Sequence, residues 1–110
     1  MGNSKKTKKA VNEVSLVDLS LIDKSTFNPR KKFDETALNE LSESIKQQGL
    51  LQPIKIRPIT GTNRYEIVFG ERRYRAALIA GLKNIPAMIS VMSDDEAEDA
   101  AIVENLHRKD

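Results

Sequence analysis

The sequence has 110 residues, of which 39% are hydrophobic and 31% charged, an ordinary composition for one small soluble domain. The absence of cysteine excludes disulfides, thiolate metal sites and thiol nucleophiles, and a single histidine excludes a multi-histidine metal site within the chain. No apolar run is long enough to cross a bilayer and no signal-peptide apolar region is present, so we expect a cytoplasmic protein without membrane contact.

The formal net charge is only +2, but the charges are segregated along the chain. Residues 1–12 are polar and rich in lysine without periodicity, which predicts a disordered basic tail. Such a tail is either a solubilising extension or an arm that contacts DNA or an acidic partner. The folded domain is expected to cover residues 13–110, and residues 13–22 alternate apolar and polar as in a β-strand and its exit.

The next predicted element is a helix over residues 35–48, with Asp34 as its N-cap and Gly49 just past its end. Its apolar residues repeat on one face, at Leu38, Leu41 and Ile45. Residues 54–57 and 64–68 then alternate as strands on either side of a Gly-Thr-Asn turn, which predicts a β-hairpin.

A glycine-led arginine cluster follows the hairpin, in Gly70-Glu71-Arg72-Arg73-Tyr74-Arg75-Ala76. β-branched and aromatic residues precede it and helix-favouring residues follow it as far as Gly81, so Gly70 is expected to join a strand to a helix. Arginines at a helix N-terminus oppose the macrodipole unless an anion offsets them. Uncapped N–H groups, a glycine that allows close approach and forked guanidiniums predict a phosphate site. The alternative is a solvated basic helix without a ligand.

Residues 84–91 form the last predicted strand, and Ser93 and Glu96 match a capping box that begins a final helix. The acidic residues of its first turn favour the macrodipole, which gives them a structural explanation. Its small apolar residues are expected to form a closely packing face: Ala97, Ala100, Ala101, Val103 and Leu106. His107 is expected to be a surface residue near the end of this helix.

Three separated stretches match one family pattern in the right order. They are Gln52-Pro53-Ile54-Lys55-Ile56-Arg57, Gly70-Glu71-Arg72-Arg73-Tyr74-Arg75-Ala76 and Glu104-Asn105-Leu106-His107-Arg108. Together they resemble the ParB N-terminal domain, and Asn28-Pro29-Arg30 followed by Phe33 resembles the segment before that family's first helix. The resemblance implies an α+β fold similar to that of sulfiredoxin, with a small mixed sheet, a β-hairpin and about three packed helices.

The resemblance also implies a function: the CTP- and Mg²⁺-binding switch domain of a plasmid or chromosome partition protein. CTP would close two subunits into a clamp on DNA, and slow CTP hydrolysis would help to reopen it. A ParA-type ATPase would be contacted through the basic tail. The helix-turn-helix and dimerisation domains of the family are absent from this sequence, so specific DNA readout would belong to them. We therefore expect either a truncated protein or a stand-alone relative.

The resemblance assigns site residues by their position in the three stretches. Cofactor-binding roles are implied for Gln52, Arg57, Gly70, Glu71, Arg72, Arg73, Asn105 and Arg108. Glu104 and Asn105 would approach the magnesium ion and the phosphates, and Glu71 is the candidate catalytic residue for hydrolysis. His107 stands where the family most often has glutamine.

Two alternative functions are compatible with these residues. One is a nuclease or phosphodiesterase, for which Glu71 and Glu104 are the only plausible carboxylate pair. The other is a DNA-binding adaptor that has kept the fold and lost the nucleotide. The repair activity of sulfiredoxin is excluded, because it requires a reactive thiol and the sequence has no cysteine.

Overall fold

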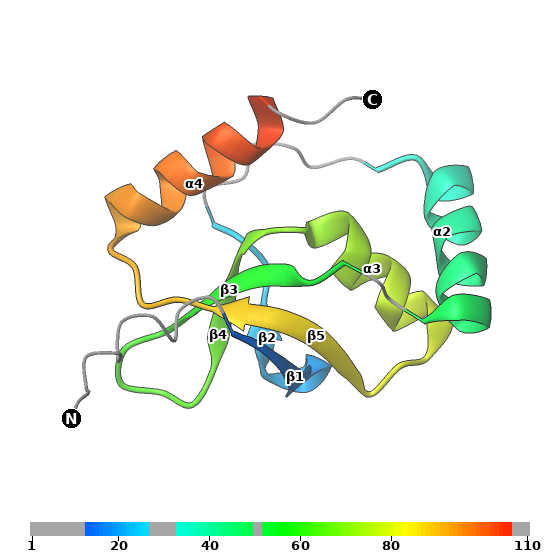
Figure 1. The fold of residues 1–110 in the computed structure, drawn as a ribbon, viewed down its shortest axis with the longest axis horizontal. Coiled ribbons are helices and arrows are strands. Elements are labelled where there is room, and N and C mark those ends of the chain that lie inside the picture. The colour runs from blue at the N-terminus through cyan, green and yellow to red at the C-terminus, as the bar shows by residue number, and fades with distance from the viewer. Residues whose placement is uncertain (1–12, 27–32, 50–51, 107–110) are drawn as a thin grey trace.

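The computed structural model describes residues 13–26, 33–49 and 52–106, which form a five-stranded sheet accompanied by helices (Figure 1). The strands are β1 (Val14–Asp18), β2 (Ile22–Asp23), β3 (Ile54–Pro58), β4 (Tyr65–Phe69) and β5 (Asn84–Ile89). The helices are α2 (Glu35–Gln48), α3 (Glu71–Ala80) and α4 (Asp94–Leu106), with a short 3-10 turn, η2 (Leu19–Leu21). This arrangement confirms the α+β prediction.

The strands lie in the order β1-β5-β3-β4-β2, and the antiparallel pairing of β3 with β4 confirms the predicted hairpin. β5 is parallel to β3 and antiparallel to β1, while β2 is parallel to β4. The first predicted strand is divided by η2, because the Asp18 carboxylate accepts the Ser20 backbone N–H at 2.8 Å and turns the chain.

β1 and β2 lie at opposite edges of the sheet although only η2 separates them. The four steps from Asp18 to Ile22 span at most about 14 Å. The outer strands of a flat five-stranded sheet would lie about 19 Å apart. The sheet must therefore curl until its two edges approach each other.

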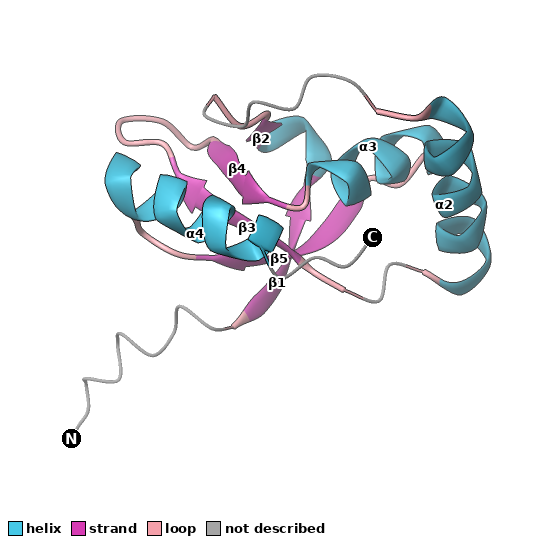
Figure 2. Cartoon of the chain, turned by 90° about the horizontal axis from the view of Figure 1, so that it is seen from above, coloured by secondary structure: helices cyan, strands magenta, loops and turns pink. Residues whose placement is uncertain are grey.

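The main core lies between the sheet and α3. Its most buried members from the sheet are Ile54, Ile56, Ile67, Ile85 and Ala87, and α3 contributes Tyr74 and Ala77. A second cluster joins α2 to α3 through Leu38, Ile45 and Ala76. Figures 1 and 2 place α2 and α4 at opposite ends of the molecule with α3 between them. Because α3 contributes residues to both clusters, it is the central helix of the core.

Both ends of α2 form as local capping predicts. The Asp34 carboxylate accepts the Thr36 N–H at 3.0 Å, and Gly49 donates its N–H to the Ile45 carbonyl at 2.7 Å. Gly49 has a φ of 82°, a backbone angle that favours glycine. The predicted bounds of this helix, 35–48, are confirmed.

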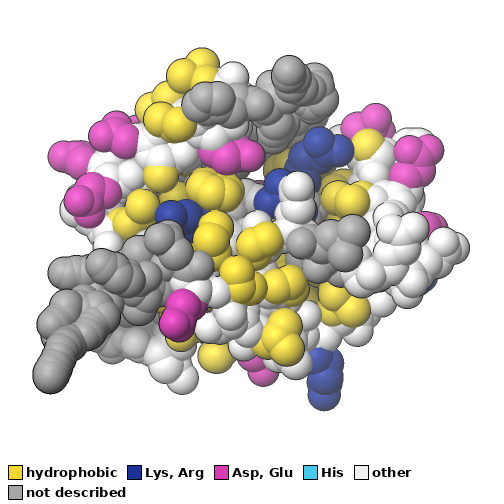
Figure 3. Space-filling model, in the orientation of Figure 1, with side chains coloured by type: hydrophobic (Ala, Val, Ile, Leu, Met, Phe, Trp, Pro, Cys, Tyr) yellow, Lys and Arg dark blue, Asp and Glu magenta, His cyan; other side chains and the backbone are white. Residues whose placement is uncertain are grey.

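The capping box at the start of α4 is also confirmed, since Ser93 N–H donates to Glu96 Oε1 at 2.9 Å and Glu96 N–H to Ser93 Oγ at 3.1 Å. The expectation of a closely packed apolar face is correct for Ala97, which is fully buried, and wrong for Val103 and Leu106, which are 50% and 77% exposed. The reason is that α4 packs against β4 near its beginning, and Figure 3 shows hydrophobic side chains at the surface over the helix.

Some predictions fall on residues that the structure does not describe. These are the basic tail (1–12), Asn28-Pro29-Arg30, and the pair His107 and Arg108. β5 ends at Ile89, two residues before the end of the predicted strand. Within the described parts of the chain, no helix is both long enough and apolar enough to cross a membrane.

Candidate functional site

Gly70 forms the junction between β4 and α3. Its φ and ψ are 102° and 22°, in the left-handed region that favours glycine. A Cβ atom at this position would lie 2.7 Å from Cγ2 and 2.8 Å from Cβ of Ile54, the first residue of β3. The beginning of α3 is therefore pressed against the beginning of β3, and only glycine permits this approach.

The N-terminus of α3 has no side-chain cap, since glycine occupies the capping position. Tyr74 N–H makes the first helical hydrogen bond, to the Gly70 carbonyl at 3.1 Å. The amides before it point out of the helix end, where the macrodipole is positive. This geometry would suit an anion, and anion binding at this helix end stays a prediction.

Arg73 contacts Gln52, another of the predicted binding residues, and the neighbouring Pro53. Its Nη2 donates to Gln52 Oε1 and its Nη1 to the Pro53 carbonyl, both at 3.1 Å. The fork therefore reaches from the first turn of α3 to the residues that precede β3. Arg72, the next cation of the cluster, is half-buried in the same turn. Arg73 and Gln52 are thus brought together beside the Gly70 junction.

Glu71 lies at the first position of α3 and its side chain is only 7% exposed. Its Oε2 accepts two hydrogen bonds from Arg75, from Nε at 3.2 Å and from Nη2 at 3.0 Å. The Arg75 guanidinium also stacks over the Phe33 ring, 4.4 Å from its centre. Arg75 therefore holds the Glu71 carboxylate in place, and its stacking on Phe33 fixes the position of its own guanidinium.

Arg57 belongs to a different cluster, on the face of the sheet that α4 covers. Nε and Nη2 donate to Glu66 Oε1 at 3.0 and 2.7 Å, Nη1 donates to the Met92 carbonyl at 3.1 Å, and Nη2 pairs with Asp94 at 2.8 Å. These donors face protein groups rather than the start of α3. A ligand-binding role of Arg57 stays a prediction, and sequence reasoning had not anticipated this network.

The electrostatics of that cluster are set by Glu66. Burial raises the pKa of its carboxyl group, but hydrogen bonds from Thr26 and Arg57 outweigh burial and hold the pKa below its usual range. Burial lowers the pKa of Arg57, and the bonds to Glu66 and Asp94 more than reverse that effect. Both side chains are therefore charged near neutral pH.

Glu104 and Asn105 lie in the last turn of α4, half-buried and exposed respectively. Figure 1 shows that end of α4 standing apart from the start of α3, so the structure does not bring them to Gly70 and Arg73. Within residues 13–26, 33–49 and 52–106 no group of three potential metal-binding side chains gathers, and Arg108 lies outside these residues.

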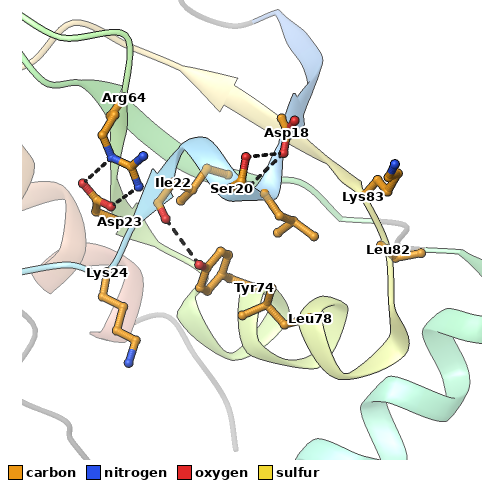
Figure 4. Close-up of a pocket in the computed structure, with 11 residues that line it drawn as sticks. Asp18, Ser20, Ile22, Asp23, Lys24, Arg64, Tyr74, Leu78, Leu82 and Lys83 are labelled. Atoms are coloured by element: carbon orange, nitrogen blue, oxygen red, sulfur yellow. Dashed lines mark hydrogen bonds and ion pairs between the residues drawn. The ribbon is translucent and has the colours of Figure 1, made fainter.

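A pocket of about 570 Å³ opens elsewhere, between η2, β2 and α3 (Figure 4). Tyr74 donates its hydroxyl to the Ile22 carbonyl at 3.3 Å there, and Arg64 pairs with Asp23 at one end. Leu78 and Leu82 contribute apolar lining. None of the predicted site residues lines this pocket, and we assign the candidate site to the start of α3, where Arg73 contacts Gln52 beside the Gly70 junction.

Comparison with known proteins agrees with the sequence resemblance. The profile of the ParB N-terminal domain family matches residues 3–106. The chromosome-partitioning protein Spo0J of Thermus thermophilus is 54% identical over 82 residues, which cover 74% of this chain and 30% of that protein. This chain therefore spans less than a third of that relative's length.

Solved structures give the same result. A C-terminally truncated ParB of Caulobacter crescentus, complexed with CTP-γ-S, superposes with a TM-score of 0.82 and 39% identity over 90% of this chain and 56% of that one. The same protein complexed to the centromeric parS site gives a TM-score of 0.74 over 87% of this chain and 49% of that one, with 38% identity.

Sulfiredoxin from Arabidopsis thaliana gives a TM-score of 0.62 with 26% identity and covers 87% of this chain and 99% of that one, which confirms the predicted fold likeness. The family profile spans nearly all of the described structure, and the strand, hairpin and arginine-led helix occur in the predicted order. The chain belongs to the ParB N-terminal domain family.

Proposed function

We propose that this chain is the nucleotide-binding switch domain of a ParB-type partition protein, and that it binds CTP with Mg²⁺ at the start of α3. The observation that carries the proposal is the Gly70 junction, which presents an uncapped helix N-terminus beside the fork of Arg73. A related ParB was solved with CTP-γ-S, which supports a cytidine triphosphate as the ligand.

The chemistry of the site suits a polyphosphate. Helix amides and the guanidiniums of Arg72 and Arg73 supply donors for phosphate oxygens, while the Gln52 amide lies within reach of the same fork. A magnesium ion bridging phosphate oxygens needs few protein ligands. Under this proposal Glu104 and Asn105 supply them when the end of α4 moves toward α3.

Closure on DNA is the second part of the proposal. Displacement of α4 by the nucleotide would alter the surface on which its exposed apolar residues lie, and two copies would then associate there to form a clamp on DNA. A related ParB was solved in complex with the centromeric parS site, which supports DNA of that kind as the partner. The basic tail would serve a ParA-type ATPase, and the protein would work on the nucleoid or a plasmid in the cytoplasm.

Glu71 is the proposed catalytic residue of a slow CTP hydrolysis. A carboxylate at the first helical position lies next to the phosphates proposed to bind there, and two hydrogen bonds from Arg75 fix its orientation. In that position it would accept a hydrogen bond from the attacking water and orient it toward the γ-phosphate.

Isothermal titration calorimetry tests the binding proposal directly. CTP, UTP, ATP and GTP are titrated into the protein with Mg²⁺, and CTP again with the metal chelated. Saturable binding of CTP that weakens without metal and with the other nucleotides supports the proposal. Absence of CTP binding at millimolar nucleotide contradicts it.

A further inference from the structure

Two charged residues are buried side by side on the face of the sheet covered by α4. The side chains of Arg57 on β3 and Glu66 on β4 are 12% and 8% exposed, and the two residues are partners across the hairpin. Both oxygens of the Glu66 carboxylate are used. Oε1 accepts Nε and Nη2 of Arg57, and Oε2 accepts the Thr26 N–H at 2.9 Å and the Thr26 hydroxyl at 2.7 Å.

The remaining donors of Arg57 reach the beginning of α4. Nη1 binds the Met92 carbonyl at 3.1 Å, two residues before the helix, and Nη2 pairs with Asp94 in its first turn at 2.8 Å. One guanidinium therefore connects β3, β4 and the entry to α4. Through Glu66 the connection extends to Thr26, three residues after β2.

Burial of an ion pair is an inefficient source of stability, because desolvation offsets much of the attraction. A planar guanidinium that binds three separate groups does, however, fix the positions of those groups relative to one another. The rest of α4 offers few competing contacts: Ala97 is buried, while Ile102, Val103 and Leu106 are at least half exposed. The direction of α4 is consequently set near its N-terminal end, where Arg57 binds.

We infer that Arg57 is a positioning residue that anchors the beginning of α4 and, through Glu66, Thr26, and so sets where Glu104 and Asn105 stand relative to α3. The inference rests on the proposed function for its consequence in nucleotide binding, but the anchoring itself is a property of the protein without nucleotide. In this role Arg57 acts through Glu66, Met92 and Asp94.

The chain provides a matched control in Arg64. Arg64 also forms a two-donor pair with a carboxylate, that of Asp23, and it precedes β4 directly. The side chains of Arg64 and Asp23 are 41% and 44% exposed. The Arg64 guanidinium points to Asp23, the last residue of β2, and not to the beginning of α4. Arg57→Lys and Arg64→Lys therefore make the same chemical change in an anchor and in an ordinary surface pair.

Hydrogen–deuterium exchange without nucleotide is the first measurement. In Arg57→Lys a single ammonium replaces the fork, so amide exchange in residues 92–100 and 24–26 should accelerate about tenfold while residues 35–48 keep wild-type rates. Arg64→Lys should leave residues 92–100 unchanged. Equal protection of residues 92–100 in wild type and Arg57→Lys, or the same acceleration in Arg64→Lys, overturns the inference.

A milder pair of variants serves if Arg57→Lys does not fold. Asp94→Asn removes one contact of the fork, and Asp95→Asn removes an exposed acid from the same helical turn. Because the Asp94 side chain is 93% exposed, exchange in residues 92–100 should rise only about twofold to fivefold in Asp94→Asn. Equal effects of the two substitutions would show that the helix dipole, and not the anchor, is responsible, and would overturn the inference.

The consequence for the site is measured by titrating CTP with Mg²⁺ into the same variants. Arg57→Lys should bind CTP about tenfold more weakly than the wild type does. Arg64→Lys should bind within twofold of wild type. If Arg57→Lys exchanges faster but binds CTP as wild type does, the positioning role is wrong. If the wild type itself does not bind CTP, the proposed function fails while the exchange result still decides the anchor.

Discussion

Gly70 and Ile54 are in contact at the point where β4 passes into α3, and a Cβ atom on Gly70 would lie 2.7 Å from the Ile54 Cγ2 atom. Ile54 is itself completely buried and begins β3. Neither residue has room to move away, because the core of the sheet and α3 closes around them. The contact ties the position of the start of α3 to the packing of the core.

Gly70→Ala should destabilise the fold by about 2–4 kcal/mol, the sum of a strained positive φ and an overpacked contact. Urea unfolding followed by circular dichroism measures this loss. Gly81→Ala is the matched control, since Gly81 ends the same helix with a φ of 83° and a Cβ atom there would meet nothing within 4 Å. It should cost only about 1 kcal/mol. Equal costs at the two ends would contradict the packing explanation.

Glu66 should make the fold sensitive to acid. Its folded pKa lies below that of the unfolded chain, so the stabilisation is fully present above about pH 4.3 and is lost as the pH falls through the folded pKa. Unfolding free energies measured by urea between pH 3 and pH 7 should show this loss. Glu66→Gln should flatten it and should cost about 3 kcal/mol at pH 7, because Arg57 loses the charged partner that is buried with it.

The control for that experiment is Asp23→Asn. The hydrogen bond from Arg64 lowers the pKa of Asp23 as well, but this pair is exposed and screened by solvent. The variant should keep most of the wild-type acid transition. A Glu66→Gln protein with an unchanged pH profile would show that another carboxylate governs acid unfolding.

Ser42 is a site where a small change should stabilise the protein. Its hydroxyl is buried among the contacts of α2 with α3 and has no hydrogen-bond partner among the described residues. Ser42→Ala removes an unsatisfied polar atom and improves helix propensity, so thermal unfolding should show a gain of about 1–2 kcal/mol. Ser44→Ala, at an exposed position of the same helix, should gain only about 0.5 kcal/mol. A loss of stability in Ser42→Ala would reveal a partner for the hydroxyl.

Glu71→Gln should separate hydrolysis from binding. The amide keeps the shape of the side chain and part of its bonding to Arg75 but cannot act as a base or orient water as a carboxylate does. We expect release of inorganic phosphate from CTP to fall by about 100-fold, while CTP affinity changes by less than about threefold. An unaltered hydrolysis rate would contradict the catalytic role of Glu71. If the wild-type protein hydrolyses no CTP, the hydrolysis proposal fails and only the nucleotide-binding switch is retained.

Much of the fold was predictable because its signals are local. Asp34 and Gly49 define α2, Gly70 and Gly81 define α3, and the Ser93 capping box begins α4, each within a few residues. Which strands become neighbours depends on distant parts of the chain. The parallel pairing of β5 with β3 and the placement of β1 and β2 at opposite edges have no local signal.

The candidate site was predictable to the same extent. Gly70, Arg72 and Arg73 lie in one stretch, and Arg73 of that stretch contacts Gln52. The pairing of Arg57 with Glu66 had a signal, because the hairpin register places the two residues opposite each other. Its extension to the Met92 carbonyl had none, since a backbone acceptor looks the same in every sequence.

The central claim is that Arg73 at the start of α3 holds the phosphates of CTP, and one calorimetric comparison tests it. CTP with Mg²⁺ is titrated into wild type, Arg73→Ala and Arg64→Ala, two variants that lose the same charge. We predict that Arg73→Ala binds at least about tenfold more weakly, while Arg64→Ala binds as wild type does. Equal affinities of Arg73→Ala and wild type, or equal losses in both variants, would contradict the claim.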